Sequence, residues 1–308
     1  MGAAREEDER LATALDRRAR IDALVAAARP RQWLKNVLVF AAPASAGALG
    51  HLGDALRTLA AAGVFVAASS GTYLVNDVLD AGADRLHPEK RARPIASGAL
   101  PPTVALVTAG VLLLAALAGA AALALGLLVV VAAYLAATFT YSLGAKRLPV
   151  VELAFVSAGF VLRAVAGGST IHVPISPWFL IVTSCLALFV VAGKRSAELT
   201  RLGGAAAAHR AALEAYPERF LASARLLVAS VAVAAYCLWV FQRGARLHGH
   251  SLVWFELSVI PFVLAVLAVE LAIETGRGGE PEELALHDRT LQALGLAWVL
   301  LFTLGVYG

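Results

Sequence analysis

Asn76-Asp77-Val78-Leu79-Asp80-Ala81-Gly82-Ala83-Asp84 follows directly on an apolar run that covers residues 56–75. Read as the end of a helix, this stretch places Asp77, Asp80 and Asp84 at i, i+3 and i+7, so their carboxylates are expected on one helix face. Carboxylates this close repel one another, and hard oxygen ligands at this spacing suit a Mg²⁺ ion shared with a substrate diphosphate. We therefore predict that the aspartates are catalytic and that they bind Mg²⁺ together with Asn76. A solvated acidic turn is the alternative.

Basic residues come soon after the acidic stretch. Their side chains bind phosphate oxygens through charge-assisted hydrogen bonds, and carboxylates that hold a metal complement them at a diphosphate. A basic cluster that merely flanks a membrane span is the alternative interpretation. The predicted substrate-binding residues of this segment are Arg85, Lys90, Arg91 and Arg93.

The chain is far more hydrophobic than a water-soluble domain of its length. Hydrophobic residues make up 59% and charged residues 16% of the 308 positions, and the mean hydropathy is +0.75. These values predict an all-α, polytopic membrane protein. Apolar segments of about 20 residues, the length that crosses a bilayer, occur nine times, at 32–50, 56–77, 102–119, 120–141, 149–168, 177–194, 226–242, 252–273 and 290–307.

The positive charges predict the orientation of these spans. Residues 1–28 are charged and lack the apolar core of a signal peptide, so we expect a cytoplasmic or interfacial leader before a single transmembrane catalytic domain at 29–308. With a cytoplasmic N-terminus, 22 of the 26 Lys and Arg residues lie on the cytoplasmic side. This asymmetry favours that orientation and an odd number of spans. Basic loops that attract anionic lipids and substrates account for the net charge of +4 without a nucleic-acid partner.

Glu152 and Arg163 are charged residues inside the otherwise apolar fifth span. Their sequence separation places them on one helix face, about 16 Å apart. Because an isolated charge in hydrocarbon is costly, we expect both side chains to face the interior of the bundle and to shape the wall of a substrate pocket. A purely structural ion pair is the alternative.

Polar residues also occur where other predicted spans meet the cytoplasmic side. Snorkelling or flanking charge explains many of them about as well as a substrate contact does, and Glu198 is spaced to pair with either Lys194 or Arg195. Because all of them are expected on the same side of the membrane as the acidic stretch, we predict substrate contacts for Lys35, Asn36, Tyr141, Lys146, Lys194, Arg195 and Glu198.

The pattern Asn76-Asp77-x-x-Asp80-x-x-x-Asp84, the downstream Arg93-Pro94-Ile95-Ala96-Ser97-Gly98 and the nine predicted spans resemble the UbiA superfamily of intramembrane prenyltransferases. The resemblance covers residues 29–308. It implies a helical bundle around a lateral cavity, with a Mg²⁺–diphosphate site beneath cytoplasmic loops.

Further segments are most similar to the actinobacterial phosphoribosyltransferase branch of this superfamily. That resemblance implies transfer of the 5-phosphoribosyl group from phosphoribosyl pyrophosphate to decaprenyl phosphate or another polyprenyl phosphate, with release of pyrophosphate, in the synthesis of cell-wall arabinan precursors. It also implies a multi-pass protein of the bacterial plasma membrane with a cytoplasmic active site; a homo-oligomer is an alternative to a monomer. The segments are 30–36, 151–153, 162–168, 191–195, 197–199 and 279–282.

One departure from the superfamily pattern favours this branch. Aromatic prenyltransferases of the superfamily carry a second acidic cluster after the sixth span, where this chain has Lys194-Arg195-Ser196-Ala197-Glu198. Fixed cations suit a site that grips an additional phosphate. Two alternatives are a polyprenyl-diphosphate:aromatic prenyltransferase and a membrane transporter, although a transporter is expected to have polar residues at the membrane midplane and an internal repeat.

Overall fold

The structure is a computed structural model that describes residues 18–88, 90–202, 215–244, 250–277 and 281–308. Within these ranges the regular structure is entirely helical, and eight helices are long and apolar enough to cross a membrane. The chain is therefore an all-α, multi-pass membrane protein. The spans consist of α3 (Leu52–Leu79), α5 (Pro102–Leu123), α6 (Leu125–Leu143), α7 (Val151–Thr170), α8 (Pro177–Leu202), α11 (Glu218–Gly244), α12 (His250–Leu257) together with α13 (Val259–Glu274), and α15 (Arg289–Tyr307).

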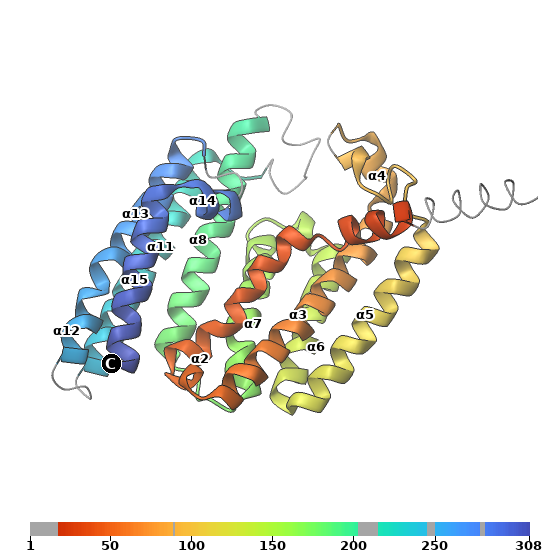
Figure 1. Ribbon diagram of the computed structural model, residues 1–308. Coiled ribbons are helices and arrows are strands. Elements are labelled where there is room, and N and C mark those ends of the chain that lie inside the picture. Colours follow the sequence, from red (N-terminus) through yellow and green to blue (C-terminus); the bar gives the residue numbers. More distant parts are fainter. Residues whose placement is uncertain (1–17, 89, 203–214, 245–249, 278–280) are drawn as a thin grey trace, which may run out of the picture.

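The predicted first span, 32–50, has a different structure from the other eight. It consists of the 3₁₀ helix η1 (Pro30–Phe40), the short helix α2 (Ala41–Ser45) and η2 (Ala48–Gly50). Pro43 removes a backbone donor, and Gly47 has a φ of 77°, so a continuous α-helix cannot form here. The described residues therefore contain eight transmembrane helices where nine were predicted. The helices η1 and α2 nevertheless run beside α3 and α7 along the bundle (Figure 1).

The boundary between the third and fourth predicted spans is also corrected. The sequence suggested a division between residues 119 and 120. In the structure Ala124 is extended, with φ −168° and ψ 142°, and it separates α5 from α6. Apolar periodicity could not find this point because alanine and leucine continue through it.

The helices form two groups that meet at α7 and α8 (Figure 1). One group contains η1, α2, α3, α5, α6 and α7, and its core is built around Phe65, Leu127 and Val131. The other contains α8, α11, α12, α13 and α15, and its core is aromatic, with Tyr236 stacked on Phe262 at 4.1 Å between ring centroids. Lipid provides no hydrophobic driving force for helix association, so close packing of these core side chains holds the bundle together.

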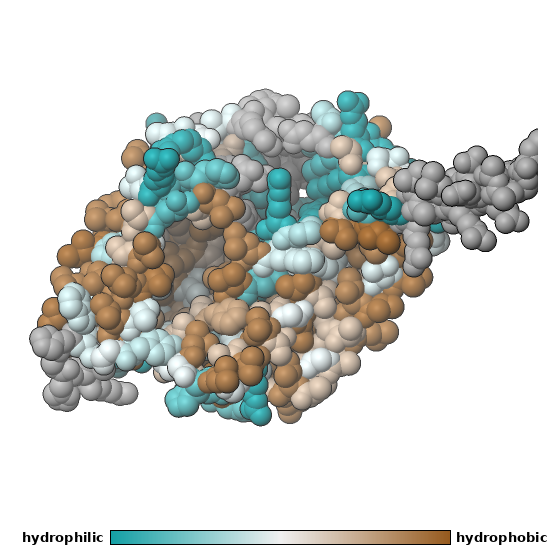
Figure 2. Space-filling view, in the orientation of Figure 1, coloured by the Kyte–Doolittle hydropathy of each residue, from teal (hydrophilic) through white to brown (hydrophobic). Residues whose placement is uncertain are grey.

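Hydrophilic side chains gather mainly at one end of the bundle, where α3, α6 and α8 finish and α7 and α11 begin (Figures 1 and 2). We call this the polar end. The C-terminus lies at the opposite end (Figure 1). Hydrophobic side chains cover the flanks, and Figure 2 shows a hollow with hydrophobic walls between the two groups of helices. Charged side chains that could bind a metal ion or phosphate groups are therefore expected at the polar end.

Gly167 of α7 lies where η1 approaches most closely, and it offers a test of this packing. A Cβ atom there would lie 2.1 Å from the carbonyl oxygen of Val39. We expect Gly167→Ala to destabilise the protein by about 1–3 kcal/mol through overpacking, measured as a lower thermal midpoint in detergent. Gly110→Ala on α5 is the matched control, because a Cβ there meets no atom of the described chain within 4 Å. Equal midpoints for the two variants would contradict the packing of η1 on α7.

Candidate active site

Asp77 and Asp84 are buried at the polar end and share one guanidinium group. Arg93 Nη1 lies 3.2 Å from Asp77 Oδ1 and 2.7 Å from Asp84 Oδ2. Arg29, which precedes η1, donates a second hydrogen bond to Asp77. The two carboxylates are exposed by only 3% and 4%, so their charges are neutralised inside the protein by these two arginines.

Asp80 has a different environment from the other two aspartates. Asp80 is the one residue between α3, which ends at Leu79, and α4 (Ala81–Leu86), so the predicted single helix through the acidic stretch is wrong at this point. The side chain of Asp80 is 43% exposed and lies 3.1 Å from Lys146 Nζ, which belongs to the connection between α6 and α7. Asn76 is also linked to α6, since its Oδ1 accepts a hydrogen bond from Ser142 at 2.8 Å.

The donor chemistry of this region fits a hard dication. Asn76, Asp77, Asp80 and Asp84 offer only oxygen ligands, which Mg²⁺ prefers. In the described part of the chain, however, no group of three or more His, Cys, Asp or Glu side chains is already arranged around a metal position. The aspartates are paired with basic residues instead. If a metal ion bound these carboxylates, the basic side chains that now pair with them would be able to bind phosphate oxygens.

A second charged cluster at the polar end joins α7 to α8. Arg195 forms a bidentate pair with Glu152, with Nε–Oε1 and Nη2–Oε2 distances of 2.8 and 2.9 Å. Glu152 is completely buried, and Arg195 also binds Glu198 at 2.9 Å. Of the two spacings considered for Glu198, the structure therefore uses the one with Arg195. Among the residues that the structure describes, no hydrogen-bond or ion-pair partner is found for the side chain of Lys194, so it is a cation able to bind a ligand.

Arg163 lies deeper in the bundle and does not interact with Glu152. Its Nε donates to Asn36 Oδ1 at 2.9 Å, and its Nη2 donates to Tyr134 at 2.9 Å. The guanidinium carbon also lies 4.7 Å from the centre of the Tyr134 ring. A structural pair between Glu152 and Arg163 is thus excluded, and both charges face the interior of the bundle as predicted.

The remaining predicted residues divide between the site and its supports. Lys35 lies over the ring of Phe160 at 5.6 Å, and Tyr141 interacts electrostatically with Arg195. Arg85 donates to the carbonyl of Ala96 at 3.2 Å, which ties the basic loop back onto α4. Lys90 and Arg91 lie in η3 (Lys90–Ala92), beside Arg93 at the polar end.

Sequence reasoning missed Arg29, Ser142 and Tyr216. Arg29 is 48 residues from its partner Asp77, and Ser142 is 66 residues from Asn76. Tyr216 accepts a hydrogen bond from the backbone of Val150. Helical periodicity relates only residues a few positions apart, so it could not predict these three contacts.

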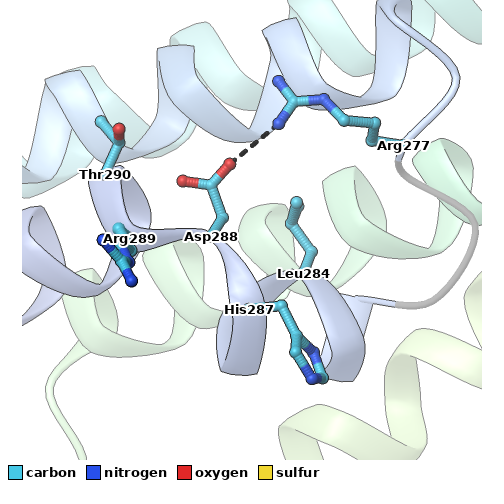
Figure 3. A pocket seen from close by; sticks show the side chains of 6 residues that line it. All are labelled: Arg277, Leu284, His287, Asp288, Arg289 and Thr290. Carbon is cyan, nitrogen blue, oxygen red and sulfur yellow. Dashed lines mark hydrogen bonds and ion pairs between the residues drawn. The ribbon is translucent and has the colours of Figure 1, made fainter.

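A separate pocket lies between α13 and α15, at the short helix α14 (Pro281–His287). Figure 3 shows Asp288 pointing toward Arg277, with a distance of 3.1 Å between Oδ2 and Nη1. The other oxygen of Asp288 caps α15 by accepting the N–H of Leu291, which lowers the pKa of this carboxyl below its ordinary value. Asp288 thus serves the structure of this connection. The pocket has a volume of about 480 Å³ and is lined by Arg277, Leu284, His287, Asp288, Arg289 and Thr290.

Known proteins are similar to this chain over most of its length. Residues 37–286 match the UbiA prenyltransferase family. The chain is 45% identical over 280 residues to the decaprenyl-phosphate phosphoribosyltransferase of Mycobacterium tuberculosis (strain ATCC 25618 / H37Rv), covering 90% of this chain and 91% of that one. It is 41% identical over 288 residues to the enzyme of the same name from Mycolicibacterium smegmatis, covering 91% of each chain.

A solved structure gives the same fold at lower sequence identity. The UbiA homologue from Archaeoglobus fulgidus bound to DMAPP and Mg²⁺ superposes with a TM-score of 0.66 and 16% identity, over 92% of this chain and 97% of that one. At this identity the likeness concerns the fold alone.

Proposed function

The chain belongs to the UbiA prenyltransferase family, and from that membership we propose that it transfers the 5-phosphoribosyl group of phosphoribosyl pyrophosphate to decaprenyl phosphate or a similar polyprenyl phosphate. The bond between the anomeric carbon and pyrophosphate breaks, and a bond from that carbon to an oxygen of the lipid phosphate forms. Relatives named decaprenyl-phosphate phosphoribosyltransferase, 41–45% identical over about 90% of the chain, support this assignment.

The proposal rests mainly on the presence of two charged clusters at the same end of the bundle. Asp77, Asp84 and Arg93 form one cluster, and Lys194 and Arg195 lie in the other. A reaction between two phosphorylated substrates needs fixed positive charge at more than one phosphate. Lys194 and the buried Arg195 supply such charge in the last turns of α8. A site that binds only one diphosphate needs less positive charge at this position.

Asn76, Asp77, Asp80 and Asp84 would hold Mg²⁺, which neutralises the developing charge of the pyrophosphate leaving group when it is bound. We propose that the phosphates are oriented by the basic residues Lys35, Lys146, Lys194 and Arg195. The wall of the substrate-binding pocket would be shaped by Arg163 and Glu152. An oxygen of a phosphate monoester is already anionic near neutral pH. Its attack therefore requires positioning more than a general base. The solved UbiA homologue bound to DMAPP and Mg²⁺ supports the choice of metal.

The lipid acceptor is proposed to keep its tail in the bilayer while its phosphate reaches the polar end. The hydrophobic hollow between the helix groups (Figure 2) offers a path for the tail, and each buried methylene group contributes about 0.8 kcal/mol to binding. The excess of Lys and Arg on one side supports a bacterial plasma-membrane protein whose polar end faces the cytoplasm, where phosphoribosyl pyrophosphate, a water-soluble metabolite, is available.

A direct assay distinguishes this function from the prenylation of an aromatic ring. Purified protein in lipid nanodiscs is incubated with Mg²⁺, radiolabelled phosphoribosyl pyrophosphate and decaprenyl phosphate, and the lipid fraction is separated by thin-layer chromatography. We expect a labelled lipid and an equal amount of pyrophosphate. Pyrophosphate release from a polyprenyl diphosphate and an aromatic acceptor, with no labelled lipid from the first mixture, would overturn the proposal.

A further inference from the structure

The connection between α6 and α7 ends in a backbone turn that valine rarely adopts. Val150 has φ 64° and ψ −46°, and the N–H of Val151 donates to the carbonyl of Pro149 at 2.7 Å. These are the features of the γ-turn with positive φ, which is rare and strained. A β-branched side chain makes it more so. Such a conformation persists only where the surrounding structure holds it.

Tyr216 supplies the contact that holds this turn. Its phenol oxygen accepts the N–H of Val150 at 2.5 Å. Only 5% of Tyr216 is exposed, and its ring stacks on Phe220 with 5.8 Å between centroids and 14° between planes. The same ring packs in a buried cluster with Leu153 of α7 and Val191 of α8. The phenol is therefore fixed in place by three different helices and is not a surface side chain that meets the turn by chance.

The strained turn determines where Glu152 lies. Val150 is the N-cap of α7, and Glu152 follows two residues later in the first helical turn. Glu152 is completely buried and holds Arg195 through both carboxylate oxygens. The same connection carries Lys146, which pairs with Asp80. A change in the dihedral angles of Val150 rotates the first turn of α7 and thereby displaces a carboxylate that has no room to adjust.

We propose that Tyr216 is a positioning residue for the phosphate-binding cations. By accepting the Val150 N–H, its hydroxyl keeps the start of α7 in the conformation in which Glu152 orients Arg195 toward a substrate phosphate. This inference rests on the proposed function for the identity of the substrate, but the structural link from Tyr216 to Glu152 does not depend on it.

Tyr216→Phe tests the inference, because it removes the hydroxyl and keeps the stacked ring. We expect kcat/KM to fall about tenfold, the size expected for one lost hydrogen bond in a buried network, mainly through a higher KM for phosphoribosyl pyrophosphate. Hydrogen exchange of the backbone amides in residues 148–153 is expected to become faster. Tyr307→Phe is the matched control, since that hydroxyl binds the carbonyl of Ala44 far from the polar end.

Val150→Gly separates positioning from direct catalysis. Glycine adopts positive φ without steric cost, so the turn depends less on the phenol. We expect Val150→Gly combined with Tyr216→Phe to recover most of the lost kcat/KM and of the lost exchange protection. Unchanged KM and unchanged exchange in Tyr216→Phe would overturn the inference, and so would a loss of activity that Val150→Gly does not relieve, since the phenol would then act on the substrate itself. If the wild type forms no labelled lipid, the proposed function fails, while the exchange measurement still decides the link to Glu152.

Discussion

Asp77→Asn combined with Asp80→Asn is expected to reduce formation of the labelled lipid by about 10³-fold, the upper part of the range for removal of preorganised charge from an active site. Asp77 is buried between Arg29 and Arg93, and Asp80 lies against Lys146. The amides keep the shape of both side chains. They lose the charge that is proposed to attract a dication to the leaving pyrophosphate, and the nearby bases lose their partners.

The control for this double variant is Asp54→Asn, which makes the same substitution in the first turn of the same helix, at the opposite end of the bundle. We expect it to retain wild-type turnover. Thermal midpoints of all variants are measured alongside activity, because Asp77 is buried and the loss of its ion pairs with Arg29 and Arg93 also lowers stability. Turnover of the folded double variant at a level similar to that of the wild type would remove the aspartates from the active site.

Arg195→Lys is expected to lower kcat/KM by about 10²-fold, as is common when a buried, hydrogen-bonded charge pair is disrupted. Lysine retains the positive charge but cannot form the bidentate pair that Arg195 makes with Glu152. The ammonium group is also too compact to bind Glu152, Glu198 and a substrate phosphate at once. The loss is expected mainly in KM for phosphoribosyl pyrophosphate, measured by the initial rate of pyrophosphate release.

Arg225→Lys provides a matched control for this substitution. Arg225 of α11 is fully buried and binds Glu270 of α13 at 2.9 Å, and neither Glu270 nor its other partner Glu274 is a predicted site residue. The change disrupts an ion pair whose arginine is as buried as Arg195 but whose Glu270 side chain is 31% exposed. It is expected to lower the thermal midpoint while leaving kcat/KM of the folded protein within about twofold of wild type, because the partners of Arg225 are not predicted to contact substrate. If both variants lose kcat/KM equally, the effect of Arg195 reflects stability and not phosphate binding.

The charged residues of the polar end show how far sequence reasoning reaches. The apolar segments fixed the depth of each residue in the membrane, so Asp77, Lys146 and Arg195 were expected at the ends of their spans, and the structure places them together at one end of the bundle. Apart from the pair of Arg195 with Glu198, which lies three residues further along the same helix, the ion pairs were not foreseen. Glu152 was considered as a partner for Arg163 because both lie in one helix, whereas its partner Arg195 belongs to the next helix.

The amino-acid sequence by itself determined that this is an all-helical membrane protein and where most of its spans lie, because hydrophobic segment length and local spacing are properties of the chain alone. The tertiary structure alone decided that the first span is broken, that Arg29 and Arg93 neutralise Asp77, and that Tyr216 holds a strained turn before Glu152. These features depend on the rotation of each helix about its axis and on which helices are neighbours. Residues 16 to 66 positions apart acquire that relation only when the bundle packs.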